Sequence, residues 1–256
     1  MSIDFSVADG VATVTINRPE RKNAVTLPMR QDFQAVFQAL EDDNEVRVII
    51  LRGAGAEFSA GADVGEMGEG GVRGSMMKSR ILRRMVRAVA YTNKPVIAAV
   101  EGVCIGMSFA LALACDFIIA SETARFQFAF RHIGLAIDAG AGWLLERHIG
   151  VMHAKQIAYS GRFVSGAEAA ALGFALEAVA PDAVQTRALE LAGSFAGAPT
   201  LALAQMKRQF DAHPGQTLND ALDYEAAVQA LMTNTEDFRE GTAAFKEKRK
   251  PTYKGA

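Results

Sequence analysis

Short, largely apolar runs without polar alternation recur along the chain, and segments with helical periodicity separate them. Two of these runs are VRVIILRG, from residue 46, and PVIAAVEG, from residue 95. A strand that is apolar on both faces must be covered on both sides, which is typical of parallel sheets. Between the two runs, apolar residues recur at helical spacing at Met77, Ile81, Leu82, Met85 and Val89. Strands that alternate with helices in this way predict a largely parallel α/β core.

The two ends of the chain depart from this alternation. Residues 2–16 predict two strands joined at Asp9-Gly10, a dipeptide that favours a tight hairpin. From about residue 199 the periodicity is helical throughout, and no strand pattern returns. We therefore expect a core over residues 1–197 and a C-terminal helical region over residues 198–256.

Residues 96–120 contain only two charged side chains, Glu101 and Asp116, and the segment is long enough to cross a bilayer. Gly102 and Gly106 interrupt it, and no aromatic residues flank it in the manner of a membrane span. A buried strand, a turn and a helix explain it better. The first residues lack the basic and apolar regions of a secretory signal, so we expect a cytoplasmic protein that does not bind a membrane.

Charge and metal-ligand spacing exclude further classes of partner. The 27 Lys and Arg residues nearly balance the 29 Asp and Glu residues, so there is no overall positive field to attract nucleic acid. Cys104 and Cys115 have no CxxC spacing and are expected in the core. The histidines, also without metal-ligand spacing, are His132, His148, His153 and His213. We expect no metal site and no nucleic-acid partner.

Two glycine-containing turns, FSAGAD at residues 58–63 and GVCIGMS at residues 102–108, each follow a predicted buried strand. Such turns direct main-chain N–H groups outward, and a helix N-terminus adds unpaired donors and partial positive charge. Two turns that face each other could hold an oxygen atom that becomes negative during a reaction. The alternative is that the glycines serve only close packing of strands and helices. Neither turn has the spacing of a P-loop.

Several motifs in a fixed order resemble the enoyl-CoA hydratase/isomerase (crotonase) family over essentially the whole chain. They are NRPERKNA, EFSAGADVGEM, KPVIAAVEGVCIGMSFALALACDFIIA, the block from Phe126 to Gly150, and AFKEKRKPTY. The resemblance implies a crotonase-like spiral core of ββα turns and a C-terminal helical trimerisation region, with homotrimers often paired into hexamers. It implies an acyl-CoA substrate, a role in fatty acid metabolism, and no cofactor beyond the coenzyme A moiety of the substrate. It also places an oxyanion hole at the N–H groups of Ala62 and Met107.

The acid and base groups of the family's hydratases are missing. By the resemblance, Ala110 and Phe130 stand where the hydratases carry their two glutamates, and Met107 stands where glycine is usual. Hydration needs one group to deprotonate water and a proton source for the α-carbon, and neither alanine nor phenylalanine can supply these. The sequence therefore disfavours hydration.

One carboxylate remains in the corresponding region, Asp138 in the turn AIDAG. Asp favours helix N-caps, so a capping role for the next helix is the alternative. Isomerases of the family resemble this chain in carrying an acidic residue here. Flanked by Phe130, Leu135 and Ile137, Asp138 is expected to lose solvent and to have a raised pKa that suits a proton carrier.

The resemblance also implies a set of coenzyme A contacts. Those near the nucleotide and the pantetheine are Lys22, Ala24, Ala60, Asp63 and Val64. Phe245 and Lys248 are expected to close over the adenine and a phosphate, from the same or a neighbouring subunit. The alternative for Lys248 is a solvated C-terminal charge run.

Two other functions remain open. One is an enoyl-CoA hydratase, a lyase, that uses a carboxylate such as Glu146 or Asp63 as acid or base. The other is a catalytically silent homologue that binds CoA esters. A dehalogenase of the same family would need a histidine on the helix over residues 76–91, and that segment has none.

Overall fold

The computed structural model describes residues 3–68 and 70–256. A six-stranded sheet forms its centre, in the order β1-β2-β3-β4-β6-β9. All neighbours are parallel except β1 and β2, which form the predicted hairpin around Asp9 and Gly10, both with positive φ. The strands are β1 (Ile3–Ala8), β2 (Val11–Ile16), β3 (Val48–Gly53), β4 (Val96–Val100), β6 (Phe117–Ser121) and β9 (Glu177–Val179). The parallel α/β core is confirmed.

A second sheet of three short strands lies beside the first, in the order β5-β7-β8. Its strands are β5 (Val103–Ile105), β7 (Arg125–Gln127) and β8 (Val164–Ser165). The sequence predicted only a turn where β5 forms, because a three-residue strand is too short to show a period. The outermost strand of the large sheet, β9, is equally short.

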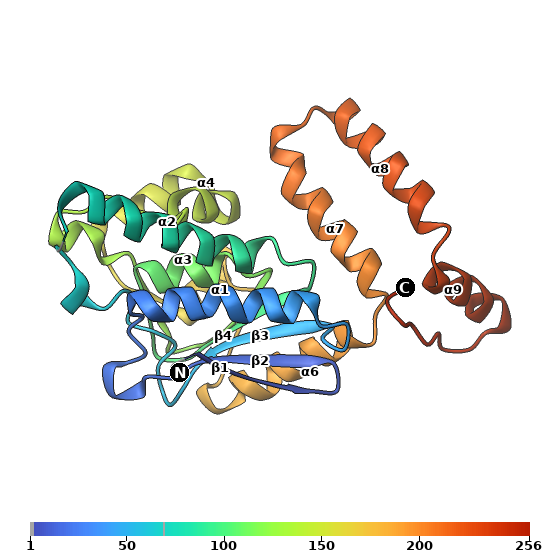
Figure 1. The fold of residues 1–256 in the computed structure, drawn as a ribbon, viewed down its shortest axis with the longest axis horizontal. Helices are drawn as coiled ribbons and strands as arrows, with labels where there is room; N and C mark the ends of the chain where they lie inside the picture. The colour runs from blue at the N-terminus through green and yellow to red at the C-terminus, as the bar shows by residue number, and fades with distance from the viewer. Residues whose placement is uncertain (1–2, 69) are drawn as a thin grey trace.

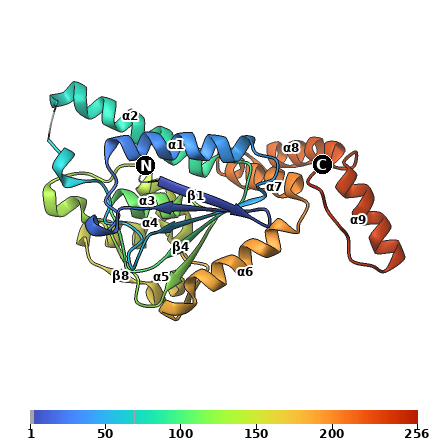
Figure 2. The same cartoon turned by 60° about the horizontal axis from the view of Figure 1, so that its bottom comes forward.

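Helices cover both faces of the large sheet (Figures 1 and 2). The helices of the core are α1 (Leu27–Asp42), α2 (Gly71–Ala90), α3 (Met107–Leu113), α4 (Ala141–Ser160), α5 (Gly166–Leu172) and α6 (Val184–Ala196). Along β3, Ile49 and Leu51 pack in the core beneath α1 to α4, whereas Val48 and Ile50 pack against α6. The continuous apolar run in the sequence is therefore buried on both sides, as expected for a parallel strand.

Short 3-10 helices occupy the loops between these elements. They are η1 (Pro19–Arg21), η2 (Val64–Glu66), η3 (Ala129–Ile133), η4 (Pro181–Ala183) and η5 (His213–Gly215). Of these, η1, η2 and η3 belong to the loops that form the candidate site described below.

The C-terminal helices α7 (Thr200–Ala212), α8 (Leu218–Met232) and α9 (Glu236–Glu247) extend away from the core (Figure 1). Polar contacts of Lys207 and of Arg47 connect this arm to the core. The Nζ atom of Lys207 lies 2.8 Å from the carboxylate of Asp116, and Arg47 donates to the carbonyls of Ala198 and Tyr253 at 2.7 and 3.0 Å. The helical periodicity predicted after residue 199 is confirmed. Within the described ranges, no helix is both long and apolar enough to cross a membrane.

Candidate active site

The two glycine-containing turns lie side by side. Ser59, after β3, donates its N–H to Val103 at 2.9 Å and accepts from the N–H of Ile105 at 3.1 Å. The hydroxyl of Ser108 donates to that of Ser59 at 2.6 Å, and both side chains are fully buried. The hydroxyl of Ser59 in turn donates to the carbonyl of Asn23 at 2.7 Å. Segments far apart in the sequence are therefore joined by buried hydrogen bonds at one place.

Ala62 lies on the first turn with an unused N–H group. Its neighbours pair with Val25 on both sides: the N–H of Val25 donates to Gly61 at 2.8 Å, and that of Asp63 donates to Val25 at 3.1 Å. This alternation leaves the N–H of Ala62 without an acceptor in the part of the chain that the structure describes. This N–H group is therefore available to a ligand.

Met107 presents the second unused N–H group. It is the first residue of α3, after Gly106 in a backbone conformation with φ 57°. The N–H of Met107, like the other first N–H groups of a helix, has no intrahelical partner, and no other acceptor is present among the described residues. The side chain of Met107 is buried in the core, so it does not obstruct the turn from the solvent side.

Gly61 shows how closely the two turns approach. A Cβ atom added to Gly61 would lie 2.6 Å from the carbonyl oxygen of Ile105 and 3.9 Å from the nitrogen of Met107. Its φ of +95° is also a conformation that side chains rarely adopt. Only glycine permits this contact, which places the N–H groups of Ala62 and Met107 on adjoining turns. Chemically, such a pair of donors can stabilise an oxygen that gains negative charge.

Asp138 lies in the turn between η3 and α4 and does not cap the helix. The N-cap is Gly140, with φ 76°, and Asp138 instead accepts through its carbonyl from the N–H of Ala141 at 2.9 Å. The capping alternative is therefore wrong, because the left-handed glycine displaces the helix start by two residues. Leu135 and Ile137 are exposed, so the apolar cover expected around Asp138 is incomplete.

The surroundings of Asp138 nevertheless alter its acidity. Its carboxylate reaches solvent, but the surrounding protein removes enough water to raise the pKa of the group. The positive charge of Arg30 acts in the opposite direction. A carboxyl group with a raised pKa is more readily protonated than an ordinary aspartate, which favours a role as a proton carrier.

Ala110 and Phe130, which by the resemblance stand where hydratases carry glutamates, lie next to the second turn. Ala110 is fully buried on α3, and its N–H donates to Gly106 at 3.2 Å. Phe130 on η3 is half-buried, and its ring lies 3.9 Å from where a Cβ of Gly106 would be. Apolar side chains therefore occupy both places where the sequence comparison expected acid and base groups.

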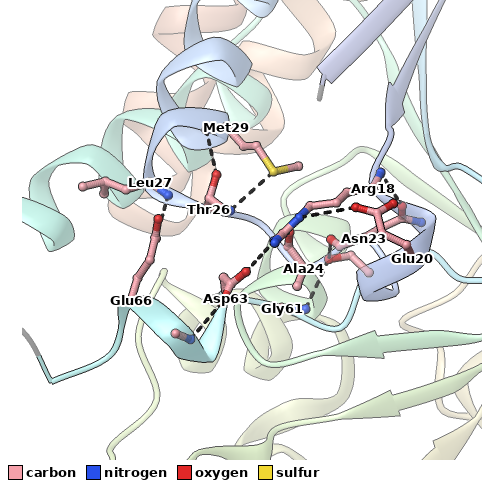
Figure 3. Close-up of polar contacts among 12 residues, drawn as sticks. Arg18, Glu20, Asn23, Ala24, Thr26, Leu27, Met29, Gly61, Asp63 and Glu66 are labelled. Atoms are coloured by element: carbon pink, nitrogen blue, oxygen red, sulfur yellow. Dashed lines mark hydrogen bonds and ion pairs between the residues drawn. The ribbon is translucent and has the colours of Figure 1, made fainter. Parts of the chain in front are cut away.

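Asp63 is held in place by its neighbours (Figure 3). Its carboxylate pairs with the guanidinium of Arg18 and accepts from the N–H of Gly65 at 2.8 Å. The hydrogen bond from Arg18, followed by that from Gly65, lowers the pKa of Asp63. A carboxylate that stays ionised and paired is a poor acid or base near neutral pH, which argues against Asp63 as the unplaced group of a hydratase.

The structure brings together five of the seven residues predicted to contact coenzyme A. Lys22, in a left-handed conformation, accepts through its carbonyl from the N–H of Ala60 at 2.9 Å. Its ammonium group is exposed, 3.3 Å from the carboxylate of Glu57. Val64 and Asp63 follow the Ala62 turn directly, and Ala24 accepts from Arg18 at 3.1 Å. These residues lie on the two loops that pair beside the unused N–H of Ala62.

Phe245 and Lys248 lie elsewhere, at the end of α9. This helix is at the opposite end of the molecule from the loop that bears Asp63 (Figures 1 and 2). Phe245 is 87% exposed and borders an apolar groove of about 590 Å³ between α7, α8 and α9. Within one chain these residues do not reach the site, so their predicted closure over coenzyme A needs a neighbouring chain and stays a prediction. Glu146 is exposed on α4.

Arg30 belongs to the site and was missed by the sequence analysis. It lies on α1, is 7% exposed, and experiences the charges of Glu66 and Asp138. Glu66 accepts from the N–H of Leu27 at 2.7 Å, which ties η2 to the start of α1 (Figure 3). The available signal was the i, i+3, i+7 spacing of Arg30 with Phe33 and Phe37, which places the arginine on the buried face.

Comparison with known proteins agrees with this geometry. The family model described as enoyl-CoA hydratase/isomerase matches residues 6–256. The chain is 35% identical to a 1,2-epoxyphenylacetyl-CoA isomerase of Escherichia coli, over 97% of each chain. It is 34% identical to a Rhodobacter capsulatus protein named "Probable enoyl-CoA hydratase", over 99% of this chain and 98% of the other. The crystal structure of an enoyl-CoA hydratase from Bacillus anthracis superposes with a TM-score of 0.96 at 31% identity, covering both chains fully.

Proposed function

The chain belongs to the enoyl-CoA hydratase/isomerase family, and we propose that it is an isomerase that moves a double bond in an acyl-CoA thioester. Membership and the crotonase fold make it an enzyme of hydratase or isomerase type. The choice of isomerisation rests on one observation: the pKa of Asp138 is raised by loss of solvent, while Ala110 and Phe130 stand, by the resemblance, where hydratases carry their glutamates. One similar protein, that of Escherichia coli, is itself named an isomerase.

The proposed reaction needs one base and one anion site. Asp138 removes a proton from C2 of a 3-enoyl-CoA, and the electron pair moves into the carbonyl to give a dienolate. The unused N–H groups of Ala62 and Met107 donate to the thioester oxygen, which carries the negative charge. Protonated Asp138 then returns the proton to C4, and the 2-enoyl-CoA is formed without change in composition. Two such donors stabilise a developing oxyanion by several kcal/mol.

Hydration is the second candidate, favoured by the names of other relatives and structural neighbours. It would require Glu146 or another carboxylate to activate water. The two reactions are separated by offering crotonyl-CoA and a 3-enoyl-CoA to the purified enzyme. We expect isomerisation and only background water addition, and rapid hydration of crotonyl-CoA would contradict the proposal.

The more general test is exchange of the C2 proton of a saturated acyl-CoA in deuterated water, followed by mass spectrometry. We expect exchange in the wild type, a loss of about 10²–10⁴-fold in Asp138→Asn, and no loss in the matched control Glu146→Gln. Full exchange in Asp138→Asn would rule out Asp138 as the base. Tight binding of acyl-CoA without exchange or turnover would instead identify a silent binding homologue.

We further propose that the substrate's nucleotide lies along Lys22 and Ala24 and its pantetheine along Ala60, Asp63 and Val64. We also propose that the chain assembles as a homotrimer or a pair of trimers. The exposed Phe245 and the apolar groove between α7, α8 and α9 support an assembly role for the arm. Phe245 and Lys248 then reach the coenzyme of a neighbouring chain. Light scattering that gives the mass of a single chain at micromolar concentration would contradict this.

A further inference from the structure

Arg30 carries a buried positive charge without a hydrogen-bonded partner. It lies on the face of α1 that also bears Phe33 and Phe37, both in the core. Only 7% of the residue is exposed, and its Nε–H group is enclosed and donates to no partner among the described residues. Over residues 3–68 and 70–256 its guanidinium forms no hydrogen bond and no ion pair. Buried arginines are almost always paired, so this one retains donors for something that the chain itself does not supply.

The surroundings of Arg30 define where those donors are available. The charges that act on it are Glu66, on η2, and Asp138, in the turn before α4. The carboxylate of Glu66 is occupied by the N–H of Leu27 at 2.7 Å and forms no ion pair with Arg30. The segment that leads into α1 pairs through Val25 with the turn that bears Ala62. Arg30 therefore lies within reach of the charge of the proposed base, on a helix whose leading segment pairs with the turn of the proposed anion site.

We propose that Arg30 determines acyl specificity by donating hydrogen bonds to a neutral oxygen, such as a carbonyl or ether oxygen, on the acyl group beyond the thioester. This rests on the proposed function, since Asp138 and Ala62 fix where the acyl group enters. The guanidinium offers rigid N–H donors and no acceptor, so its ligand must supply oxygen. A carboxylate on the acyl group would be repelled by both Glu66 and Asp138, whereas a neutral oxygen is not. A purely apolar acyl chain would leave buried donors unpaired, which a site of this kind disfavours.

The test compares thioesters that differ only at the acyl group: hexanoyl-CoA, 4-oxohexanoyl-CoA, 5-oxohexanoyl-CoA and the carboxylate-bearing adipoyl-CoA. Their Kd values are measured by calorimetry for the wild type, Arg30→Met, Arg30→Lys and the matched control Arg84→Met, an exposed arginine on α2. In the wild type and the control we expect an oxo compound to bind about 10-fold or more tightly than hexanoyl-CoA. Arg30→Met should abolish this preference, and Arg30→Lys should keep part of it.

Thermal unfolding separates a binding role from a structural one. Methionine fills similar space without an unpaired charge, so Arg30→Met should raise the unfolding midpoint. If the midpoint falls while the preference for the oxo thioesters over hexanoyl-CoA is kept, Arg30 has a structural role and the proposal is overturned. If Arg30→Met does not fold, the same comparison is made with Arg30→Lys. A preference for adipoyl-CoA would overturn the assignment to a neutral oxygen. Equal binding of all four thioesters overturns the role of Arg30 but leaves the isomerase proposal standing, whereas no binding of any thioester overturns both.

Discussion

Replacing Gly61 with alanine tests whether the contact between the two turns matters for catalysis. The new Cβ would start 2.6 Å from the carbonyl oxygen of Ile105, and real Cβ contacts essentially never fall below 3.0 Å. Both partners are main chain, so the turn that bears Ala62 must move away from the turn that bears Met107. Oxyanion donors work at 2.7–3.1 Å from the charged oxygen, and the loss of one lowers kcat by about 10²–10³-fold, or ~3 kcal/mol. The left-handed φ adds a stability cost of roughly 1–2 kcal/mol.

Gly173 provides a control that has nearly the same φ without the clash. Its φ is +94°, against +95° for Gly61, and a Cβ there would meet nothing closer than 4.0 Å. Gly173→Ala should therefore lose similar backbone stability but keep its activity. The assay is exchange of the C2 proton of an acyl-CoA in deuterated water, with the unfolding midpoint measured on the same samples.

The comparison of the two variants decides the outcome. If Gly61→Ala folds and exchanges protons as fast as Gly173→Ala, the N–H groups of Ala62 and Met107 do not act together on the thioester oxygen. If Gly61→Ala loses exchange while its CoA-ester affinity is retained, the defect lies in the charged intermediate rather than in ground-state binding.

Three further outcomes follow from the contacts. The exchange rate should rise with pH as Asp138 ionises, with a midpoint above the usual aspartate pKa of about 3.9. In Arg30→Met the same pH series should give a higher midpoint, because Arg30 lowers the pKa of Asp138. Asp63→Ala should lose about 1 kcal/mol of stability at pH 7, because Asp63 caps η2. The pKa of Asp63 is lowered in the folded protein, so the difference in denaturation midpoint between wild type and variant should persist down to about pH 4. It should vanish as Asp63 is protonated at lower pH. Lys207→Met should lose about 1–3 kcal/mol and make α7 more sensitive to limited proteolysis, since Asp116 loses its charged partner; unchanged cleavage would show that the arm is held elsewhere.

The fold was largely predictable because its strong signals are local. The Asp9-Gly10 hairpin, the strand that contains Val48 to Leu51 and the helical C-terminal region each follow from a period or a turn dipeptide. The strands β5 and β8 of the second sheet were not predictable, because they have two or three residues each and depend on partners far away in the sequence. Strands this short are defined by tertiary pairing rather than by their own pattern.

The site was predictable only in part. The adjoining turns were located from their glycines, and the family resemblance drew attention to Asp138. The capping alternative failed because Gly140 adopts the N-cap conformation, which a sequence rule that favours Asp over Gly does not anticipate. Arg30 was missed because an arginine on an amphipathic helix is usually solvated. The charges of Glu66 and Asp138 come within reach of Arg30 only in the folded chain.

The pair of unused N–H groups has a consequence for how such an enzyme can change over evolutionary time. Both donors are main-chain atoms, so no substitution at Ala62 or Met107 other than proline removes them. The groups that handle protons are side chains, and one nucleotide change can add or delete a carboxylate at such a position. Lineages can therefore exchange one reaction for another while the same charged intermediate is kept, and the products formed should diverge much faster than the scaffold that stabilises it.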